Sequence, residues 1–215
     1  MHLIISEENK MESQNENIVI TASRLFEQFG IRSVSIDNVC NELRISKKTF
    51  YTYFPQKEDL VNAVLLYKKK IHYERFEKLF KDKNAIDSLI LMIKEVKKGV
   101  DTESLTMCFD LQKYYPKVYE KHEMIKTTEM KLGFEMNLRQ GIAEGFYREN
   151  LDVELISLFH SVQLKNSFEL MLQSSKKYTK KRLVDFFLDL MVHLIANEKG
   201  LKYMEEQALK DSKNK

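Results

Sequence analysis

The chain has 215 residues, of which 43% are apolar and 31% are charged, and its formal net charge is only +3. This composition is typical of a folded globular protein and excludes a disordered or collagen-like chain. Two cysteines are too few for a disulfide framework, so we interpret both as reduced core thiols. No segment approaches the roughly 18 consecutive apolar residues of a membrane span. We therefore expect a cytoplasmic protein without a membrane partner.

The first predicted helix ends at Gly30, because glycine commonly terminates helices. Upstream of Gly30, apolar residues recur at the spacing of one helical face: Ile18, Ala22, Leu25, Phe26 and Phe29. Residues 1–16 begin with a short apolar patch and continue with polar and acidic side chains. We predict that this segment is a flexible N-terminal arm.

Two short helices follow, and a tight break at residues 44–45 separates them. Ser35 precedes the first helix and Ser46 the second, where their hydroxyls can accept hydrogen bonds from free backbone N–H groups. The second helix, residues 47–54, turns its two phenylalanines toward the first. The first helix carries one apolar stripe, made by Ile36, Val39, Cys40 and Leu43.

The other face of the second helix carries cations, hydroxyls and phenols. From Leu43 to Lys57 there are four basic residues and no acidic one. A two-helix unit with one buried face and one basic face is suited to the major groove of DNA. We therefore predict DNA contacts at Ser35, Ser46, Lys47, Lys48, Thr49, Tyr51, Tyr53 and Lys57.

Different members of this set suit different parts of the DNA. The lysines are expected to neutralise phosphates, whereas residues 47–49, in the first turn, are best placed for base edges. The hydroxyls of Tyr51 and Tyr53 can reach phosphates at the edge of the groove. A core position is the alternative for both tyrosines.

Residues 17–61 resemble the TetR (tetracycline-repressor) family of transcriptional regulators. The matching positions are Gly30, Ser35, Ile36, Val39, Ile45, Ser46, Thr49, Phe50, Tyr51, Tyr53, Phe54, Lys57 and Leu60. The chain departs from the family at Arg44 and Lys48, where glycine is usual or frequent. The resemblance implies a homodimer that binds a double-stranded inverted-repeat operator and responds to a small molecule. Repression is the family default, and activation stays open.

The rest of the chain predicts further helices and no strand, because alternation of period two never extends beyond a few residues. We expect an all-α protein of about nine helices, with a three-helix helix-turn-helix unit before a C-terminal bundle. The expected boundaries are 17–60 for DNA binding, 61–200 for effector binding and dimerisation, and 201–215 for a C-terminal tail.

The last two predicted helices, residues 153–172 and 183–195, are apolar on most sides and must be buried on most sides. A second copy of the chain is the economical partner for the faces that its own core leaves uncovered. Burial inside one chain is the alternative. The predicted dimer interface contains Leu155, Phe159, Val162, Phe187, Leu190 and Leu194.

The resemblance also implies an effector cavity in the C-terminal helices. The candidate lining is rich in methionine and aromatic residues and poor in charge, which suits an apolar or aromatic effector. A plain core position is the alternative for each residue, including the single histidine of the set. The candidates are Met107, Phe109, Tyr114, Met130, Phe134, His160, Leu164 and Phe168.

Enzyme motifs are missing from the sequence. It contains no HExxH, GxSxG, phosphate-binding glycine loop or CxxC, and its five histidines are scattered. We therefore predict no catalytic residue, metal site or cofactor. The alternative to a DNA-binding regulator is a helical protein-interaction bundle without DNA-binding activity, and salt-dependent DNA binding separates the two.

Overall fold

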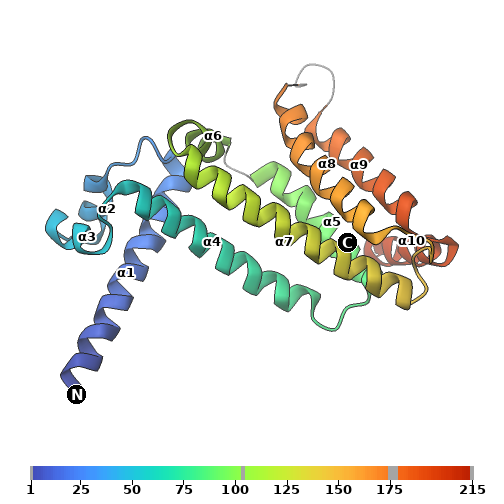
Figure 1. The fold of residues 1–215 in the computed structure, drawn as a ribbon, viewed down its shortest axis with the longest axis horizontal. Coiled ribbons are helices and arrows are strands. Elements are labelled where there is room, and N and C mark those ends of the chain that lie inside the picture. Colours follow the sequence, from blue (N-terminus) through green and yellow to red (C-terminus); the bar gives the residue numbers. More distant parts are fainter. Residues whose placement is uncertain (1, 103–104, 174–178, 214–215) are drawn as a thin grey trace. The chain divides into compact units, whose positions relative to one another are not determined.

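The computed structural model of the protein is a set of ten α-helices in its described residues (Figure 1). It describes the backbone of residues 2–102, 105–173 and 179–213, and the side chains of residues 13–98, 106–163, 179 and 181–210. Over these ranges no strand occurs, although one isolated β-bridge pairs Tyr147 with Ala196. The predicted all-α class is therefore confirmed. None of the described helices has the length and apolar character needed to cross a membrane.

The chain divides into two compact units, whose boundaries differ from those predicted. The N-terminal unit comprises residues 1–77 and 104–123, and the C-terminal unit comprises residues 78–103 and 124–215. Residue 60 is not a boundary because the helix that begins at Lys57 is continuous to Phe80. Residues 104–123 join the N-terminal unit because the helix they contain packs on the first helix.

The N-terminal unit contains α1(His2–Phe29), α2(Ile36–Leu43), α3(Lys47–Tyr53), most of α4(Lys57–Phe80), α6(Leu105–Tyr114) and the first residues of α7(Pro116–Ala143). The helical backbone of α1 extends through the segment expected to be a flexible arm. The physical reason is that residues 2–29 contain neither proline nor glycine, so nothing in the backbone chemistry interrupts the helix.

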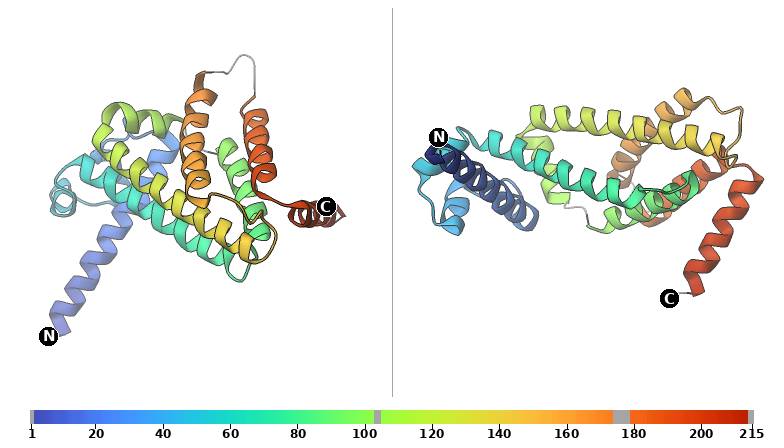
Figure 2. Two further views of the ribbon diagram at one scale, coloured as in Figure 1. Left: turned by 45° about the vertical axis from the view of Figure 1, so that its right-hand side comes forward. Right: turned by 90° about the horizontal axis from the view of Figure 1, so that it is seen from below.

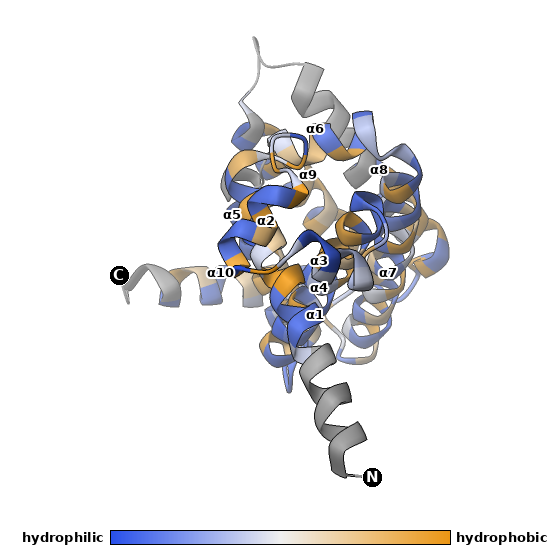
Figure 3. Cartoon of the chain, turned by 90° about the vertical axis from the view of Figure 1, so that its left-hand side faces the viewer, coloured by the Kyte–Doolittle hydropathy of each residue, from blue (hydrophilic) through white to orange (hydrophobic). Residues whose placement is uncertain are grey.

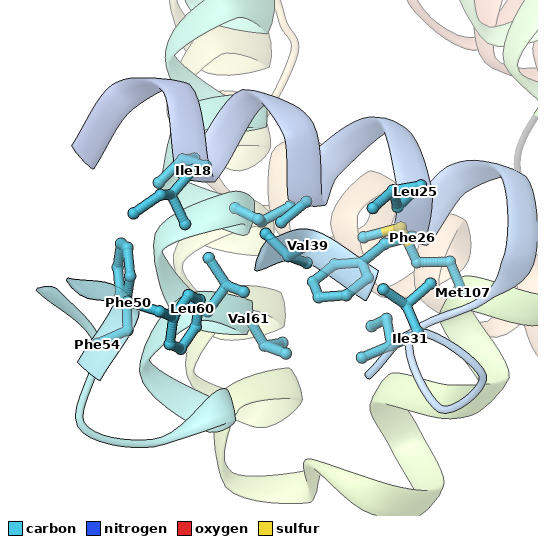
Figure 4. Close-up of a cluster of buried hydrophobic side chains, with 14 of the residues drawn as sticks. Ile18, Leu25, Phe26, Ile31, Val39, Phe50, Phe54, Leu60, Val61 and Met107 are labelled. Atoms are coloured by element: carbon cyan, nitrogen blue, oxygen red, sulfur yellow. The ribbon is translucent and has the colours of Figure 1, made fainter. Parts of the chain in front are cut away.

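The N-terminal unit is held together by one apolar core (Figure 4). Phe26 of α1 and Phe50 of α3 are fully buried in it, and Leu60 of α4 is 1% exposed. Met107 of α6 closes the same core from the side of Phe26 and Ile31. Burying a large side chain of this kind contributes about 1.5–3 kcal/mol, so these contacts fix the positions of α2 and α3.

The C-terminal unit contains α5(Ala85–Thr102), the rest of α7, α8(Val153–Gln173), α9(Lys180–Ile195) and α10(Glu198–Lys213). Both hydrophobic and hydrophilic residues occur along these helices (Figure 3). α8 and α9 lie side by side (Figure 1 and Figure 2). The core of the unit is formed by Ala85, Ile86, Leu89, Phe134, Leu138, Tyr147, Met191, Val192, Ile195 and Ala196.

Tyr147 anchors the connection between α7 and α8. Its ring fills the space beside Gly141, where an added Cβ would lie only 2.1 Å from the ring. Its hydroxyl donates to Asn137 Oδ1 at 2.9 Å, and the Asn137 amide donates to the Ala85 carbonyl at 2.8 Å. The connection is therefore an ordered part of the core, and a side chain at position 141 would displace the tyrosine.

α10 was not expected, because residues 201–215 were predicted to form a tail. Its first turns carry Leu201, Tyr203 and Met204, which pack on the core of the C-terminal unit. Gly200 allows this approach, since an added Cβ there would lie 2.2 Å from the Phe146 carbonyl oxygen. The tenth helix thus exists because one of its faces is apolar enough to be covered.

Candidate nucleic-acid interface

Two serine caps fix the ends of the helices in the helix-turn-helix. The Ser35 hydroxyl accepts the Asn38 N–H at 3.1 Å, and Asn38 Oδ1 accepts the Ser35 N–H at 2.8 Å in return. At the second helix, the Ser46 hydroxyl accepts the Thr49 N–H at 3.0 Å. Removing such a cap typically costs about 1 kcal/mol, so both serines orient the unit whether or not they also contact DNA.

α3 presents one side to the core and the other to solvent. Phe50 and Phe54 are buried, and the ring of Tyr51, which is 46% exposed, meets Phe50 edge-on at 5.6 Å. Tyr53 is half-buried and packs against the N-terminal core. Tyr51 is therefore not a core aromatic, whereas Tyr53 is partly one.

The centre of the solvent face was not fully identified from the sequence. Lys48 and Thr52 each lie two residues from Phe50, which places them about 200° around the helix from it, and both are exposed. The Thr52 hydroxyl donates to the Thr49 carbonyl at 2.6 Å. Thr52 was overlooked, although a helical wheel centred on the two phenylalanines would have indicated it. The DNA contacts themselves stay a prediction.

The first residue of α3 is engaged in an ion pair. Lys47 Nζ lies 2.8 Å from Asp37 Oδ1, and both side chains are more than half exposed. The hydrogen bond to Asp37 and the charge of its carboxylate raise the pKa of Lys47. Asp37 was not among the predicted site residues, because nothing in a sequence shows that residues ten apart on two helices will meet.

Lys57 is tied to the turn between α1 and α2. Its ammonium donates to the carbonyl oxygens of Ile31, at 2.6 Å, and of Val34. Burial lowers the pKa of Lys57, and the charge of Asp110 partly offsets this effect. The predicted phosphate contact stays a prediction, but the structure gives Lys57 a second role as a link within the unit.

The same turn is held from α6. The Arg32 N–H donates to Asp110 Oδ2 at 2.8 Å, and Asp110 is only 5% exposed. The Arg32 guanidinium donates to the Tyr114 hydroxyl and lies 4.9 Å from the centre of that ring. Turn residues 30–34 are therefore held from two sides, by the half-buried ammonium of Lys57 on α4 and by the buried carboxylate of Asp110 on α6.

Arg44 ends α2 in a left-handed conformation, with φ 54° and ψ 40°. Its N–H donates to the Asn41 carbonyl at 3.2 Å, and the next N–H, of Ile45, donates to the Cys40 carbonyl at 3.0 Å. This is the Schellman arrangement, in which glycine is usual because a side chain strains the left-handed backbone. The turn keeps its geometry despite the non-glycine residue.

The predicted effector residues are divided between the two units. Met107 is buried in the N-terminal core, Phe109 is exposed, and Tyr114 is the partner of Arg32. The side chains of Leu164 and Phe168 lie outside the described residues. The structure therefore brings only part of the set together, and a common effector site stays a prediction.

One aromatic pair in the C-terminal unit does unite two members of the set. The imidazole of His160 packs on the buried ring of Phe134, with 4.2 Å between the centroids. Burial lowers the pKa of His160 to about 4, so the ring is neutral at physiological pH. Met130 is 37% exposed on the same helix as Phe134.

The predicted dimer residues lie on apolar stripes that the chain leaves uncovered. On α8 the exposed residues follow helical spacing, and on α9 they recur every four residues. Phe187 is half-buried, whereas Leu158 and Phe186 are exposed and were not predicted. The exposed members are Leu155, Leu158, Phe159, Val162, Phe186, Leu190 and Leu194.

The buried side of α8 carries small polar residues instead. Ser157 and Ser161 are buried one turn apart, and their hydroxyls donate to backbone carbonyls of their own helix. In the part of α8 whose side chains are described, Val153 and Ile156 also pack against the core, whereas large apolar side chains such as Phe159 face solvent. Large apolar side chains exposed next to one another on a helix are typical of an interaction surface.

A family model described as "Bacterial regulatory proteins, tetR family" matches residues 18–64. An uncharacterized HTH-type transcriptional regulator of Bacillus subtilis (strain 168), YuxN, is 42% identical over 57 residues. That match spans 26% of this chain and only 20% of the relative's length.

Solved structures with little sequence identity resemble nearly the whole chain. A transcriptional regulator from Cytophaga hutchinsonii ATCC 33406 is 15% identical, with a TM-score of 0.72 over 85% of this chain and 98% of its own. A putative transcriptional regulator from Saccharomonospora viridis, crystallised in complex with choline, is 19% identical, with a TM-score of 0.61 over 87% of this chain and 100% of its own. Identities this low establish a shared fold.

Proposed function

Since residues 18–64 match the model of bacterial regulatory proteins of the tetR family, we propose that the chain is a sequence-specific DNA-binding transcriptional regulator. It acts as a homodimer on an inverted-repeat operator, and repression is its mode of action. The location that follows is the cytoplasm, where bacterial DNA lies. The proposal assigns no catalytic activity to the chain.

The observation that carries the proposal is the solvent face of α3. Lys48 and Thr52 stand at its centre, Tyr51 flanks them, and the buried Phe50 fixes the whole face on the core of the N-terminal unit. An exposed cation and two hydroxyl groups on one short helix can donate to phosphates and base edges. A helix used only for packing has no need of such a face.

A homodimer is supported by the uncovered apolar stripes of α8 and α9. A two-fold axis beside these helices would pack each stripe on its copy, as in four-helix interfaces. The dimer would present two α3 helices, and their spacing must match one turn of DNA or a multiple of it. An inverted-repeat operator follows from this symmetry.

The proposed effector is a small apolar or aromatic molecule bound in the C-terminal unit. The stacked pair of Phe134 and His160 supports this choice, because a neutral imidazole offers one donor and one acceptor beside an aromatic surface. The S. viridis regulator was crystallised with choline, and for the present chain a compact cation is one candidate to be screened.

The test is selection of binding sites from random DNA, followed by fluorescence anisotropy across a salt series. We expect a palindromic site, and we expect Lys48→Ala to lower the slope of log K against log salt by about 0.9 per half-site if Lys48 contacts a phosphate. Lys202→Ala, an exposed lysine of α10, is the matched control and should bind like the wild type. Absence of salt-dependent DNA binding would favour the alternative of a protein-interaction bundle.

A further inference from the structure

The ion pair between α2 and α3 stands at the face proposed to meet DNA. Asp37 lies in the first turn of α2, and Lys47 is the first residue of α3. The caps at Ser35 and Ser46 fix the two helix ends, so the distance of 2.8 Å between Lys47 Nζ and Asp37 Oδ1 reflects the packing of two ordered helices. The pair is not a chance contact of mobile loops.

Asp37 changes the charge balance of this face. The segment from Leu43 to Lys57 carries four cations and no acidic residue. Of these four cations, Lys57 donates to backbone carbonyls. In the described part of the chain, Lys47 forms an ion pair with the carboxylate of Asp37. Asp37 thus brings a negative charge from α2 to the basic helix α3.

A carboxylate and a phosphate compete for the same ammonium group. DNA affinity and its salt dependence grow with the number of phosphates that the protein neutralises. While Lys47 is paired with Asp37 its charge is balanced, and contact with a phosphate requires that the pair be exchanged. The remaining carboxylate then also repels the DNA backbone.

We propose that Asp37 is an internal counter-ion that withholds Lys47 from the DNA backbone and so limits the strength and salt dependence of non-specific DNA binding. The inference rests on the proposed function. It goes beyond that function because it makes an acidic residue outside α3 a determinant of affinity. The pair is exposed, so its exchange weakens binding by no more than about five-fold per chain.

The test measures binding to a duplex of arbitrary sequence between about 50 and 200 mM salt. Asp37→Asn should tighten this binding by up to about five-fold per chain and steepen the salt slope by about 0.9 per chain. Asp37→Ser removes the same charge with a different side chain and should behave alike. Thermal unfolding of each variant verifies that the helix-turn-helix remains folded at the assay temperature.

Glu42→Gln is the matched control, because it removes the same charge from α2 and breaks another exposed ion pair, that with Arg24. It should change binding less than Asp37→Asn does. In a Lys47→Met background, Asp37→Asn should have no more effect than Glu42→Gln. The inference is overturned if Asp37→Asn equals Glu42→Gln, weakens binding, or acts equally without Lys47.

DNA binding by the wild type distinguishes a failure of the counter-ion role from a failure of the proposed function. A wild type that binds no duplex at low salt would overturn both the regulator and the counter-ion role. A wild type that binds DNA with the expected salt dependence, while Asp37→Asn only matches its control, would overturn the counter-ion role alone.

Discussion

Arg44 carries backbone strain at a turn that positions α3. A side chain in the left-handed region strains the folded state by roughly 1–2 kcal/mol. Glycine would relieve this strain, but it would also increase the conformational entropy of the unfolded chain, which offsets part of the gain in stability. We expect Arg44→Gly to raise the free energy of unfolding by about 0.5–1 kcal/mol, measured by thermal or denaturant unfolding. Arg44→Ala loses the same charge but keeps the strain, and equal effects of the two changes would contradict the explanation.

His160 predicts a pH dependence of stability. Its pKa is about 4 in the folded protein and 6.5 in the unfolded chain, so the unfolded state binds a proton between these values that the folded state does not. Stability should therefore fall as pH drops from about 6.5 to 4, by up to about 3 kcal/mol in total. Other groups also titrate in this range, and the comparison must isolate the histidine.

His160→Phe provides that comparison, because it keeps an aromatic ring beside Phe134 and cannot titrate. The difference in unfolding free energy between wild type and variant should change between pH 7 and about pH 4.5, with the wild type losing more. Urea unfolding at both pH values measures it. A constant difference would mean that the histidine is solvated in the folded state.

Single residues differ in how far sequence could predict them. Ser35 and Ser46 were expected to stand before helices, and both accept the predicted hydrogen bonds, because capping depends on neighbours three residues away. The pairing of Lys47 with Asp37 depends on the angle between two helices. The contact of Asp110 with the Arg32 N–H joins residues 78 apart, and no local pattern announces it.

At the scale of the element, replacing Lys57 can distinguish a structural role of this residue from a role in DNA binding. Hydrogen bonds that involve a charged group contribute about 1.5–3 kcal/mol, and this half-buried ammonium donates two to the turn after α1. We expect Lys57→Met to lower the free energy of unfolding by about 2 kcal/mol, measured by denaturant titration.

Lys48→Met is the control for that measurement, since Lys48 is exposed and substitutions of this kind usually change stability by less than about 0.5 kcal/mol. If Lys57 served DNA alone, both variants would be as stable as the wild type and would differ only in DNA affinity. If Lys57→Met loses both stability and affinity for all DNA sequences, the hydrogen bonds from Lys57 to the turn also support the position of α3.

Helices with strong periodicity were predictable, and their ends were less so. The stripes at Ile36 and Val39 and at Phe50 and Phe54 placed α2 and α3, because the whole signal lies within two turns. The sequence predicts a tail at the position of α10, because the apolar face of this helix is covered only by a core that distant helices form. It predicts an arm at the start of α1, because a polar composition suggests disorder even where the backbone favours a helix.

At the scale of the whole molecule, the two helices α8 and α9 were expected to be apolar on most sides. The sequence could not show which apolar residues the chain covers itself. On α9, Val184, Met191 and Ile195 face its own core, while Phe186 and Leu190 face outward. That division depends on how α9 packs against α5 and α8, which the spacing of apolar residues within one helix does not determine.

The exposed stripes predict how assembly responds to a single charge. Leu190 is 45% exposed in one chain, so glutamate at this position is tolerated by the isolated fold. In a dimer the same carboxylate would be buried without a partner, which costs several kcal/mol. We expect the wild type to sediment as a dimer at micromolar concentration and Leu190→Glu to sediment as a monomer with unchanged helix content.

Leu209→Glu is the matched control, because Leu209 is 63% exposed on α10, outside the two stripes. An inverted-repeat operator is contacted by the α3 helices of both copies at once. Leu190→Glu should therefore also lose affinity for the operator, while Leu209→Glu should remain dimeric and bind the operator like the wild type. A monomeric wild type, or two variants that sediment alike, would contradict the assignment of α8 and α9 as the interface.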